Sequence, residues 1–276
     1  MCIRDRLVAV ATMMSCSFSA CSDNDDPTPD TGTSETDAKF EAIAKQYLDH
    51  TVYVTYKNLA DETEQLVKDL QALKSSKTDA NVKATCETFL EARAWWEKSE
   101  AFLYGAATDF GIDPHIDSWP LDLDGLQTAL KNTEQVEAMG GEDGDIYAGE
   151  KLGNSLLGFH GIEYILFEDG SPKSVSKISD LHLTYAVAVA GDLRNRCWQL
   201  ELSWRGESAV NADRVAKVAN ELELPYTVNS GEYSYGENML NAGKAGSTYA
   251  SWTLAMQAII DLSLIHISEP TRQAEI

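Results

Sequence analysis

The sequence predicts an all-α protein built from helical bundles. Several long segments carry apolar residues at spacings of three, four and seven, which places one apolar stripe on each expected helix. Strand candidates are few, since only residues 225–236 are expected to hold a short irregular or strand-like piece. Long amphipathic helices with little strand between them are typical of helical bundles, so we expect this architecture.

The first helix is expected over residues 37–73, where apolar residues from Phe40 onward recur at helical spacing without glycine or proline. A turn at 75–78 follows, and Asp79 is the expected N-cap of a second helix over 80–104. Further helices are expected over residues 126–130, 178–204, 212–222 and 241–261, whereas the glycine- and aspartate-rich residues 140–149 are expected to form a loop.

Composition limits the class of partner. The formal net charge is -22, and a surface this acidic repels phosphate backbones, so nucleic acid is not an expected partner. The same charge is compatible with cations or with ligands that carry them. The 276 residues allow one large domain or two modest ones, and an apolar content of 43% argues against wholesale disorder.

The two ends of the chain are expected to be foreign to the protein. Codons for residues 1–6 and codons for residues 262–267 can be written as reverse complements of one another, as in an adapter oligonucleotide translated from each end. We therefore exclude residues 1–6 and 262–276 from fold reasoning. The natural protein is then expected to continue beyond Asp261, which leaves the helical domain of residues 37–261 incomplete at its C-terminus.

The N-terminal region indicates export and lipid attachment. Residues 7–20 form an apolar segment that is too short for a stable transmembrane helix and ends in small residues, as a secretory signal does. Residues 18–21 resemble a bacterial lipobox, in which Cys21 would carry the lipid, and the acidic residues 22–26 resemble a surface-export signal of some lipoproteins. Residues 21–36 then form a flexible tether. We expect an extracytoplasmic lipoprotein at the outer membrane or cell surface of a Gram-negative bacterium; an ordinary cleaved signal is the alternative.

Two cysteines remain inside the expected domain, Cys86 and Cys197. They could form a disulfide in an oxidising compartment. Each lies in a helical pattern, however, so two buried free thiols are an equally good interpretation.

The central segment is residues 156–167, LLGFHGIEYILF, in which a lone histidine and a lone glutamate interrupt an apolar run. His160 and Glu163 are three residues apart, so on a helix they share one face and could share a ligand. Ionisable groups in apolar runs are costly unless they are paired or coordinate a metal. The pair is therefore either a metal or ligand site or a buried structural pair, for which Arg194 and Arg196 could supply counter-charge.

In the structural alternative, the same pair would connect helices through hydrogen bonds to Arg93 or Tyr104. The second helix also carries a polar stripe, since Arg93, Trp96 and Glu100 are spaced i, i+3 and i+7. On spacing alone, a surface ion pair beside a half-buried tryptophan is the favoured explanation of this stripe.

An irregular stretch at residues 105–123 follows, and it is rich in carboxylate, imidazole and indole groups. Its prolines stiffen it and disfavour helix. A stiff loop with this composition indicates a binding element that includes His115, Asp117 and Trp119.

From about residue 47 to residue 261, the chain resembles the imelysin-like family, also called the M75 peptidase family. The most specific element is the family's GxHxxE motif, present as Gly158, His160 and Glu163. Supporting blocks are Ala94-Trp95, Glu100-Ala101-Phe102, Tyr104-Gly105 and Ile116-Asp117-Ser118-Trp119-Pro120. The resemblance implies two helical bundle-like domains with a functional site between them, and an iron- or haem-related uptake role at the envelope. This chain would lack the family's C-terminal helices.

The leading functional hypothesis is a lipoprotein that binds a metal ion or a small metal-bearing ligand, with uptake-system proteins as possible partners. The expected metal ligands are His160, Glu163, Glu100 and Asp117, and the other expected ligand-site residues are Gly158, Arg93, Trp96, Trp119, His115 and Tyr164. Histidine with carboxylates suits iron, zinc or copper. The alternative is a zinc peptidase of the M75 type, which needs three protein ligands, whereas only two have motif support. His115 would have to be brought in by folding, so we lean against an enzyme.

Overall fold

The computed structural model describes residues 35–268, with side chains through Asp261, and this part of the chain is mostly helical. The expected signal segment, the expected lipid-attachment residue Cys21 and nearly all of the expected tether lie outside the described residues, as do the excluded ends apart from the backbone of residues 262–268. The all-α prediction is confirmed.

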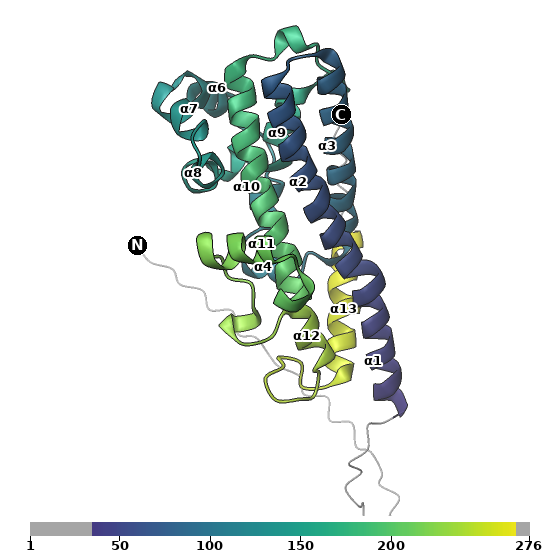
Figure 1. The fold of residues 1–276 in the computed structure, drawn as a ribbon. Helices are drawn as coiled ribbons and strands as arrows, with labels where there is room; N and C mark the ends of the chain where they lie inside the picture. The colour runs from purple at the N-terminus through teal and green to yellow at the C-terminus, as the bar shows by residue number, and fades with distance from the viewer. Residues whose placement is uncertain (1–34, 269–276) are drawn as a thin grey trace, which may run out of the picture. The chain divides into compact units, whose positions relative to one another are not determined.

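Three long helices form the framework: α2 (Tyr53–Ser75), α3 (Asp79–Ser99) and α10 (Asp180–Arg205). Helix α2 packs against both α3 and α10, and the three run side by side in Figure 1. Helix α1 (Glu35–Tyr47) continues into α2 through a π-helical segment, Leu48–Val52, so the predicted first helix is one unbroken helical rod. The periodicity of apolar residues therefore located the framework correctly.

Shorter elements cover this framework. The short helices are α4 (Ala106–Asp109), α5 (Asp113–Ile116), α6 (Leu123–Lys131), α7 (Thr133–Met139), α8 (Gly144–Lys151), α9 (Gly158–Leu166), α11 (Ala212–Val215), α12 (Tyr235–Leu240) and α13 (Trp252–Ser268). Two-residue strands β1 (Phe167–Glu168) and β2 (Ser171–Pro172) pair as an antiparallel hairpin directly after α9. Helices α6, α7 and α8 lie on one side of α10 (Figure 1).

Several predicted boundaries were wrong. The second helix ends at Ser99, with a 3-10 turn at Glu100–Phe102, and its N-cap is Thr78, whose side chain accepts from the backbone N–H of Asn81. Residues 225–234 form the irregular piece that was one of the two expected forms, and α12 follows from Tyr235. The helix expected from residue 241 begins only at Trp252. These errors lie at element ends, where caps and tertiary contacts decide the outcome.

The loop expected at residues 140–149 is instead largely helix α8. One of its glycines, Gly149, serves close packing against α10 rather than a turn. A Cβ atom at Gly149 would lie 2.2 Å from Asp192 Oδ1, so only glycine allows the two helices to approach this closely. Glycine content alone does not distinguish a loop from a closely packed helix.

The core is continuous along the framework and rich in aromatic residues. The largest fully buried side chains include Trp96, Trp204, Tyr56, Tyr185, Phe102 and Phe159. Cys86 and Cys197 are both buried and free, so the free-thiol alternative is the one that the structure contains.

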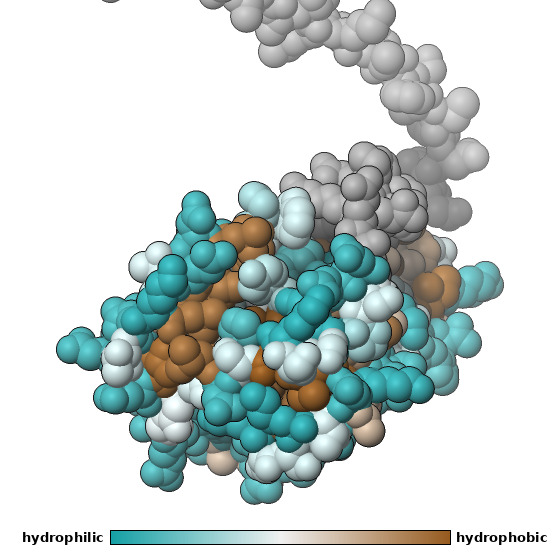
Figure 2. Space-filling view, turned by 90° about the horizontal axis from the view of Figure 1, so that it is seen from above, coloured by the Kyte–Doolittle hydropathy of each residue, from teal (hydrophilic) through white to brown (hydrophobic). Residues whose placement is uncertain are grey.

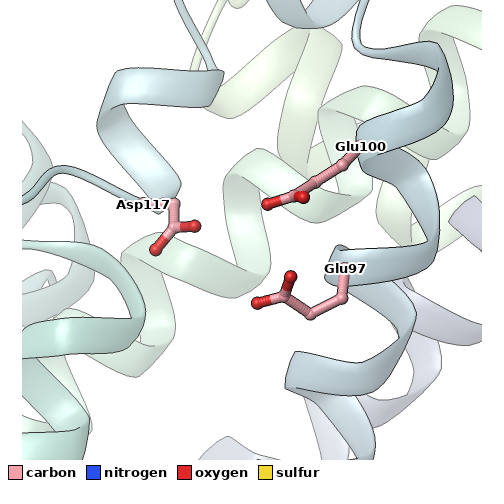
Figure 3. Close-up of side chains that lie close together, drawn as sticks. All are labelled: Glu97, Glu100 and Asp117. Carbon is pink, nitrogen blue, oxygen red and sulfur yellow. The ribbon is translucent and has the colours of Figure 1, made fainter. Parts of the chain in front are cut away.

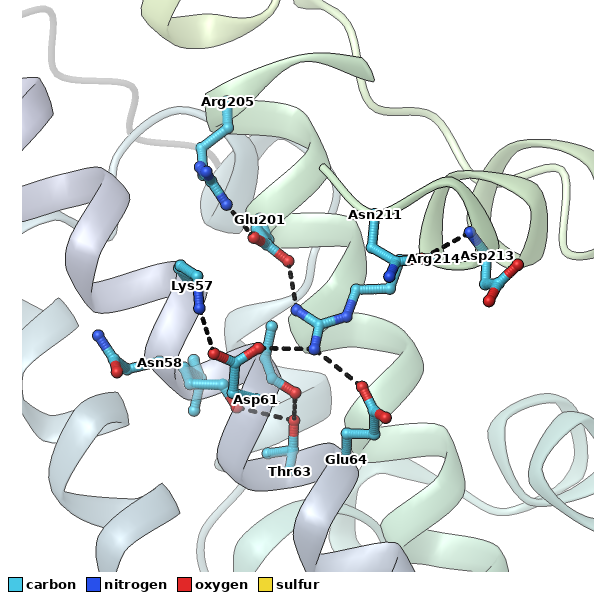
Figure 4. Close-up of polar contacts among 12 residues, drawn as sticks. Lys57, Asn58, Asp61, Thr63, Glu64, Glu201, Arg205, Asn211, Asp213 and Arg214 are labelled. Atoms are coloured by element: carbon cyan, nitrogen blue, oxygen red, sulfur yellow. Dashed lines mark hydrogen bonds and ion pairs between the residues drawn. The ribbon is translucent and has the colours of Figure 1, made fainter. Parts of the chain in front are cut away.

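A buried ion network attaches α11 to the framework. Arg214 on α11 donates to Glu201 at 2.7 Å, to Asp61 at 2.7 Å and to Glu64 at 2.8 Å, which joins α11 to α10 and α2 (Figure 4). Glu201 is only 2% exposed and also accepts a bond from Arg205. Each of the three carboxylates pairs with Arg214 and with one further cation, so the network has a structural explanation.

Some large apolar side chains remain at the surface. Among the described residues, the exposed ones are Ile43, Val54, Leu90, Trp119, Leu123, Leu181, Leu254 and Ile260. Figure 2 shows apolar surface bordered by hydrophilic residues on the face seen from above. None of the described helices combines the length and the apolar character needed to cross a bilayer.

Candidate functional site

Asp117 lies at the centre of the polar cluster. It follows α5 directly, its side chain is 13% exposed, and it is the C-cap residue of that short helix. Arg93 donates to its Oδ1, Trp96 Nε1 donates to its Oδ2 at 3.0 Å, and His160 Nε2 lies 3.0 Å from Oδ1. Burial alone would raise the pKa of Asp117, but the hydrogen bonds from His160 and Arg93 outweigh it and hold that pKa well below its usual range. Asp117 is therefore a fixed negative charge.

Helix α3 supplies two of these donors because Arg93 and Trp96 are one turn apart on the same face. Arg93 also forms an ion pair with Glu97, and its guanidinium lies 5.3 Å from the centre of the Phe159 ring. Trp96 is fully buried. The predicted stripe thus faces the predicted loop and holds Asp117 in place.

Helix α9 brings the GxHxxE residues to Asp117. Gly158 has φ of +66°, and a Cβ atom there would lie 1.9 Å from the carbonyl oxygen of Ile116, the residue before Asp117. Only glycine permits this contact, because other residues would meet both the strained backbone and the carbonyl. Gly158 therefore sets how closely His160 approaches the loop that contains Asp117.

Both ring nitrogens of His160 face carboxylates. Nε2 is next to Asp117, and Nδ1 lies 3.2 Å from Glu163 Oε2. Burial alone would lower the pKa of His160, but the hydrogen bonds with Asp117 and Glu163 outweigh it and raise the pKa to about 9. An imidazolium donates at both nitrogens and has no lone pair for a metal. In this arrangement, His160 is a bridging cation, and ligation by it requires loss of its proton.

Three carboxylates meet next to this bridge. Glu97 on α3, Glu100 just beyond it and Asp117 each offer an oxygen within 4.8 Å of the others, and the three side chains point toward one another in Figure 3. Burial raises the pKa of Glu100 to about 7, and the negative charges of Glu97 and Asp117 add to this effect. Clustered oxygen donors fit a hard or borderline cation such as iron, manganese or zinc.

The structure thus brings together Asp117, Glu100 and His160, and it adds Glu97, which the sequence reasoning missed. Glu97 is four residues after Arg93, so in sequence it reads as half of a surface ion pair. Its spacing of three from Glu100 was the signal that could have identified it. Glu163 lies on the other side of the His160 ring from Asp117 and is outside the group of three carboxylates.

The remaining predicted residues have different positions. The Trp119 ring packs against His160 with centroids 4.8 Å apart. His115 is turned away, since its Nε2 lies 2.7 Å from Asp192 Oδ2 on α10, so it fixes the loop rather than joining the carboxylates. The Tyr164 ring lies 4.6 Å from the ammonium group of Lys173.

The proposed counter-charges for Glu163 were wrong. Arg194 donates to Asp145 at 2.8 Å, and Arg196 donates to Gln199 at 3.2 Å. Both arginines lie on α10, and their partners come from α8 and from α10 itself. Glu163 instead pairs with His160, its own neighbour on α9. Which charges meet was decided by helix packing that sequence spacing does not reveal.

The bundle and this polar cluster define a class: an α-helical protein whose buried arginine and imidazolium hold several carboxylates at one point. Residues 52–250 match the family model described as Peptidase M75: Imelysin. The match covers most of the chain, so the protein belongs to the imelysin family, which confirms the resemblance.

One curated relative is "Iron-regulated protein A" of Synechococcus elongatus, which is 31% identical over 163 residues. The match covers 59% of this chain and 40% of the relative, so the chain spans less than half the length of that protein.

Two crystal structures share the fold. One is a Parabacteroides distasonis protein named after iron-regulated protein A precursors, with 22% identity and a TM-score of 0.62, over 82% of this chain and 56% of that chain. The other is an imelysin-like protein from Psychrobacter arcticum, with 14% identity and a TM-score of 0.50, over 86% of this chain and 75% of that chain.

Proposed function

We propose that this protein is an extracytoplasmic lipoprotein of the cell envelope that binds a metal ion, or a small ligand carrying one, beside its GxHxxE segment. The observation that carries the proposal is the meeting of Glu97, Glu100 and Asp117 within 4.8 Å. Like charges this close repel one another, and a bound cation would relieve that repulsion. One relative is named as iron-regulated, so Fe²⁺ is the first metal to test.

The residues have distinct proposed roles. Glu97, Glu100 and Asp117 would hold the cation through oxygen atoms, and the cation would supply positive charge at their centre. Arg93 and Trp96 fix the Asp117 carboxylate and are positioning residues. His160 and Glu163 form the adjacent wall, where His160 becomes a further ligand only once it has lost its proton.

The test is calorimetric titration of chelator-treated protein with Fe²⁺ under anaerobic conditions, and with Zn²⁺ and Mn²⁺. Glu100→Gln and Asp117→Asn should each weaken binding by about tenfold or more, because each removes a charged oxygen donor. The matched control is Glu87→Gln, an exposed residue of the same helix that pairs only with Lys83, and it should bind as wild type does. Absence of metal binding by the wild-type protein would refute the proposal.

A zinc-dependent peptidase is the second candidate, and the family description favours it. Catalytic zinc normally has three protein ligands and a water. Both nitrogens of His160 face carboxylates and His115 pairs with Asp192, so the described histidines near the site do not complete such a set. Proteolysis that a chelator abolishes and Zn²⁺ restores would support this candidate against the first.

A further inference from the structure

Asp192 is a buried carboxylate in the middle of α10, outside the proposed cation site. It is 4% exposed, and its Oδ2 lies 2.7 Å from His115 Nε2. Arg196 Nε lies 4.0 Å from its Oδ1, too far for a hydrogen bond, and is itself buried without a hydrogen-bond partner. Within the described part of the chain, His115 is therefore the one hydrogen-bond partner of this carboxylate. An apolar pair would fill the same space at a lower cost in free energy, so this pair points to a role other than stability.

The Asp192 carboxylate has little room to move. A Cβ atom at Gly149 of α8 would lie 2.2 Å from its Oδ1, so the backbone of α8 closes the space on that side. The other oxygen, Oδ2, is engaged by His115. The carboxylate is therefore a fixed point on α10 to which His115 is attached.

The α5 turn connects His115 to the proposed cation site. His115 belongs to α5, and Asp117 follows the last residue of that helix. Two residues correspond to roughly 200° of rotation on an α-helix, so the two side chains leave opposite sides of the turn. His115 accordingly contacts α10, whereas Asp117 contacts α3 and α9. The Asp117 backbone N–H donates to the carbonyl oxygen of Asp113 at 3.0 Å, so α5 and Asp117 are expected to move as one unit.

The same turn also touches α9. A Cβ atom at Gly158 would lie 1.9 Å from the carbonyl oxygen of Ile116 and 3.1 Å from that of His115. This contact is steric, so it limits only how closely α5 can approach α9. The hydrogen bond between His115 and Asp192 is an attraction that holds α5 against α10. The two contacts together set the position of Asp117.

We propose that Asp192 is a positioning residue of the cation site, and that it holds Asp117 beside Glu97 and Glu100 through His115 and α5. This inference rests on the proposed metal-binding function and identifies a residue that sets the affinity of that site. Residues that orient metal ligands from outside the ligand set contribute about 10–100-fold to metal affinity. Asp192 acts through one further residue, so the lower end of this range, about tenfold, is expected.

The test compares Asp192→Ala with Asp192→Asn in chelator-treated protein, using two measurements. The first is calorimetric titration with Zn²⁺. The second is the nuclear magnetic resonance signal of the Trp96 indole N–H in metal-free protein, because this group donates to Asp117 Oδ2 at 3.0 Å and reports the position of that carboxylate. Trp96→Phe assigns the signal. The control is Asp145→Ala, which removes another buried carboxylate that is bonded to α10, through Arg194.

Asp192→Ala removes the acceptor for His115, so it should weaken Zn²⁺ binding about tenfold and move the Trp96 signal toward that of an indole without a hydrogen bond. Asp192→Asn keeps an acceptor oxygen at the same reach and should bind within about threefold of wild type. Asp145→Ala should lower the stability but leave both measurements unchanged. If Asp192→Ala does not fold, His115→Leu breaks the same contact from the other side and should give the same two changes.

Wild-type Zn²⁺ affinity in folded Asp192→Ala would overturn the inference, whether or not the Trp96 signal moves. An equal loss of affinity in Asp145→Ala would also overturn it, because the effect would then be one of general stability. If wild type binds none of Zn²⁺, Fe²⁺ and Mn²⁺, the proposed metal-binding function fails. The Trp96 signal still decides in that case whether Asp192 holds Asp117, so the two failures are distinguishable.

Discussion

Replacing Asp117 by alanine in chelator-treated protein tests how much this carboxylate contributes to the free energy of unfolding by linking its own loop to α3 and α9. The substitution removes the acceptor for Arg93, for Trp96 and for His160 together. Two of the donors carry charge, so they would remain near each other with only Glu97 and Glu163 as counter-charges. We therefore expect a loss of stability that exceeds that of an ordinary surface substitution.

The size of the expected stability loss follows from the burial of the Asp117 carboxylate. Breaking a buried ion pair by removing one partner costs about 3–5 kcal/mol. The lower end, about 3 kcal/mol, applies here because Arg93 keeps Glu97 and His160 keeps Glu163. For a domain of this size, that loss lowers the melting temperature by roughly 6–12 °C.

The assay is urea unfolding followed by far-ultraviolet circular dichroism, with Glu87→Ala as the control for loss of an exposed carboxylate. The control should change the free energy of unfolding by less than about 0.5 kcal/mol. A loss below about 1 kcal/mol for Asp117→Ala would refute the reasoning, because it would mean that the three donors find equal partners in water.

Three further predictions concern other parts of the fold. Gly158→Ala should destabilise the protein by at least about 2 kcal/mol in chemical denaturation, since it adds a Cβ at positive φ against a carbonyl oxygen, whereas Gly153→Ala has open space and should be close to neutral. Arg214→Met should cost about 3 kcal/mol by the same assay, because it removes a buried partner of Glu201. Burial alone would raise the pKa of Asp145, but the hydrogen bond from Asn195 and the nearby cations outweigh it and lower that pKa. The Asp145 carboxylate therefore stabilises the fold above its unfolded-state pKa of 3.8, and this stabilisation is lost as pH falls through the lower folded-state pKa. The urea midpoint should therefore fall less steeply between pH 5 and pH 3 in Asp145→Asn than in wild type.

Each of these has a contrary outcome. Equal stabilities of the Gly158 and Gly153 variants would show that the start of α9 can move away from the loop at no cost. A loss for Arg214→Met no larger than for Lys83→Met, which removes an exposed ion pair outside this network, would show that the network around α11 is solvated in solution. A steeper acid limb for Asp145→Asn would contradict the sign of the pKa shift.

The long helices could be predicted because they depend on apolar periodicity, which is a local property of the sequence. The three framework helices and the pair His160 and Glu163 were located in this way, the latter with the help of the family motif. Helix α8 was missed because its glycines resemble those of a loop, although one of them, Gly149, packs closely against α10. Local composition does not distinguish a glycine that permits a turn from one that permits close helix packing.

The partners of charged groups could not be predicted for a related reason. Arg194 and Arg196 were considered as counter-charges for Glu163, yet helix packing pairs Arg194 with Asp145 of α8 and Arg196 with Gln199 of α10. Glu97 was overlooked because an acid four residues after an arginine is usually a surface ion pair. Asp117 was grouped with His160 and Glu100 from the sequence, but its three donors from two helices are a result of tertiary structure alone.

The most direct test of metal binding is the metal content of the protein purified without chelator, measured by inductively coupled plasma mass spectrometry. We predict about one transition-metal ion per chain in wild type, and little in the double variant Glu100→Gln with Asp117→Asn, whose folding is checked by circular dichroism. Metal-free wild-type protein that also takes up none on titration, or equal metal content in the folded double variant, would contradict it.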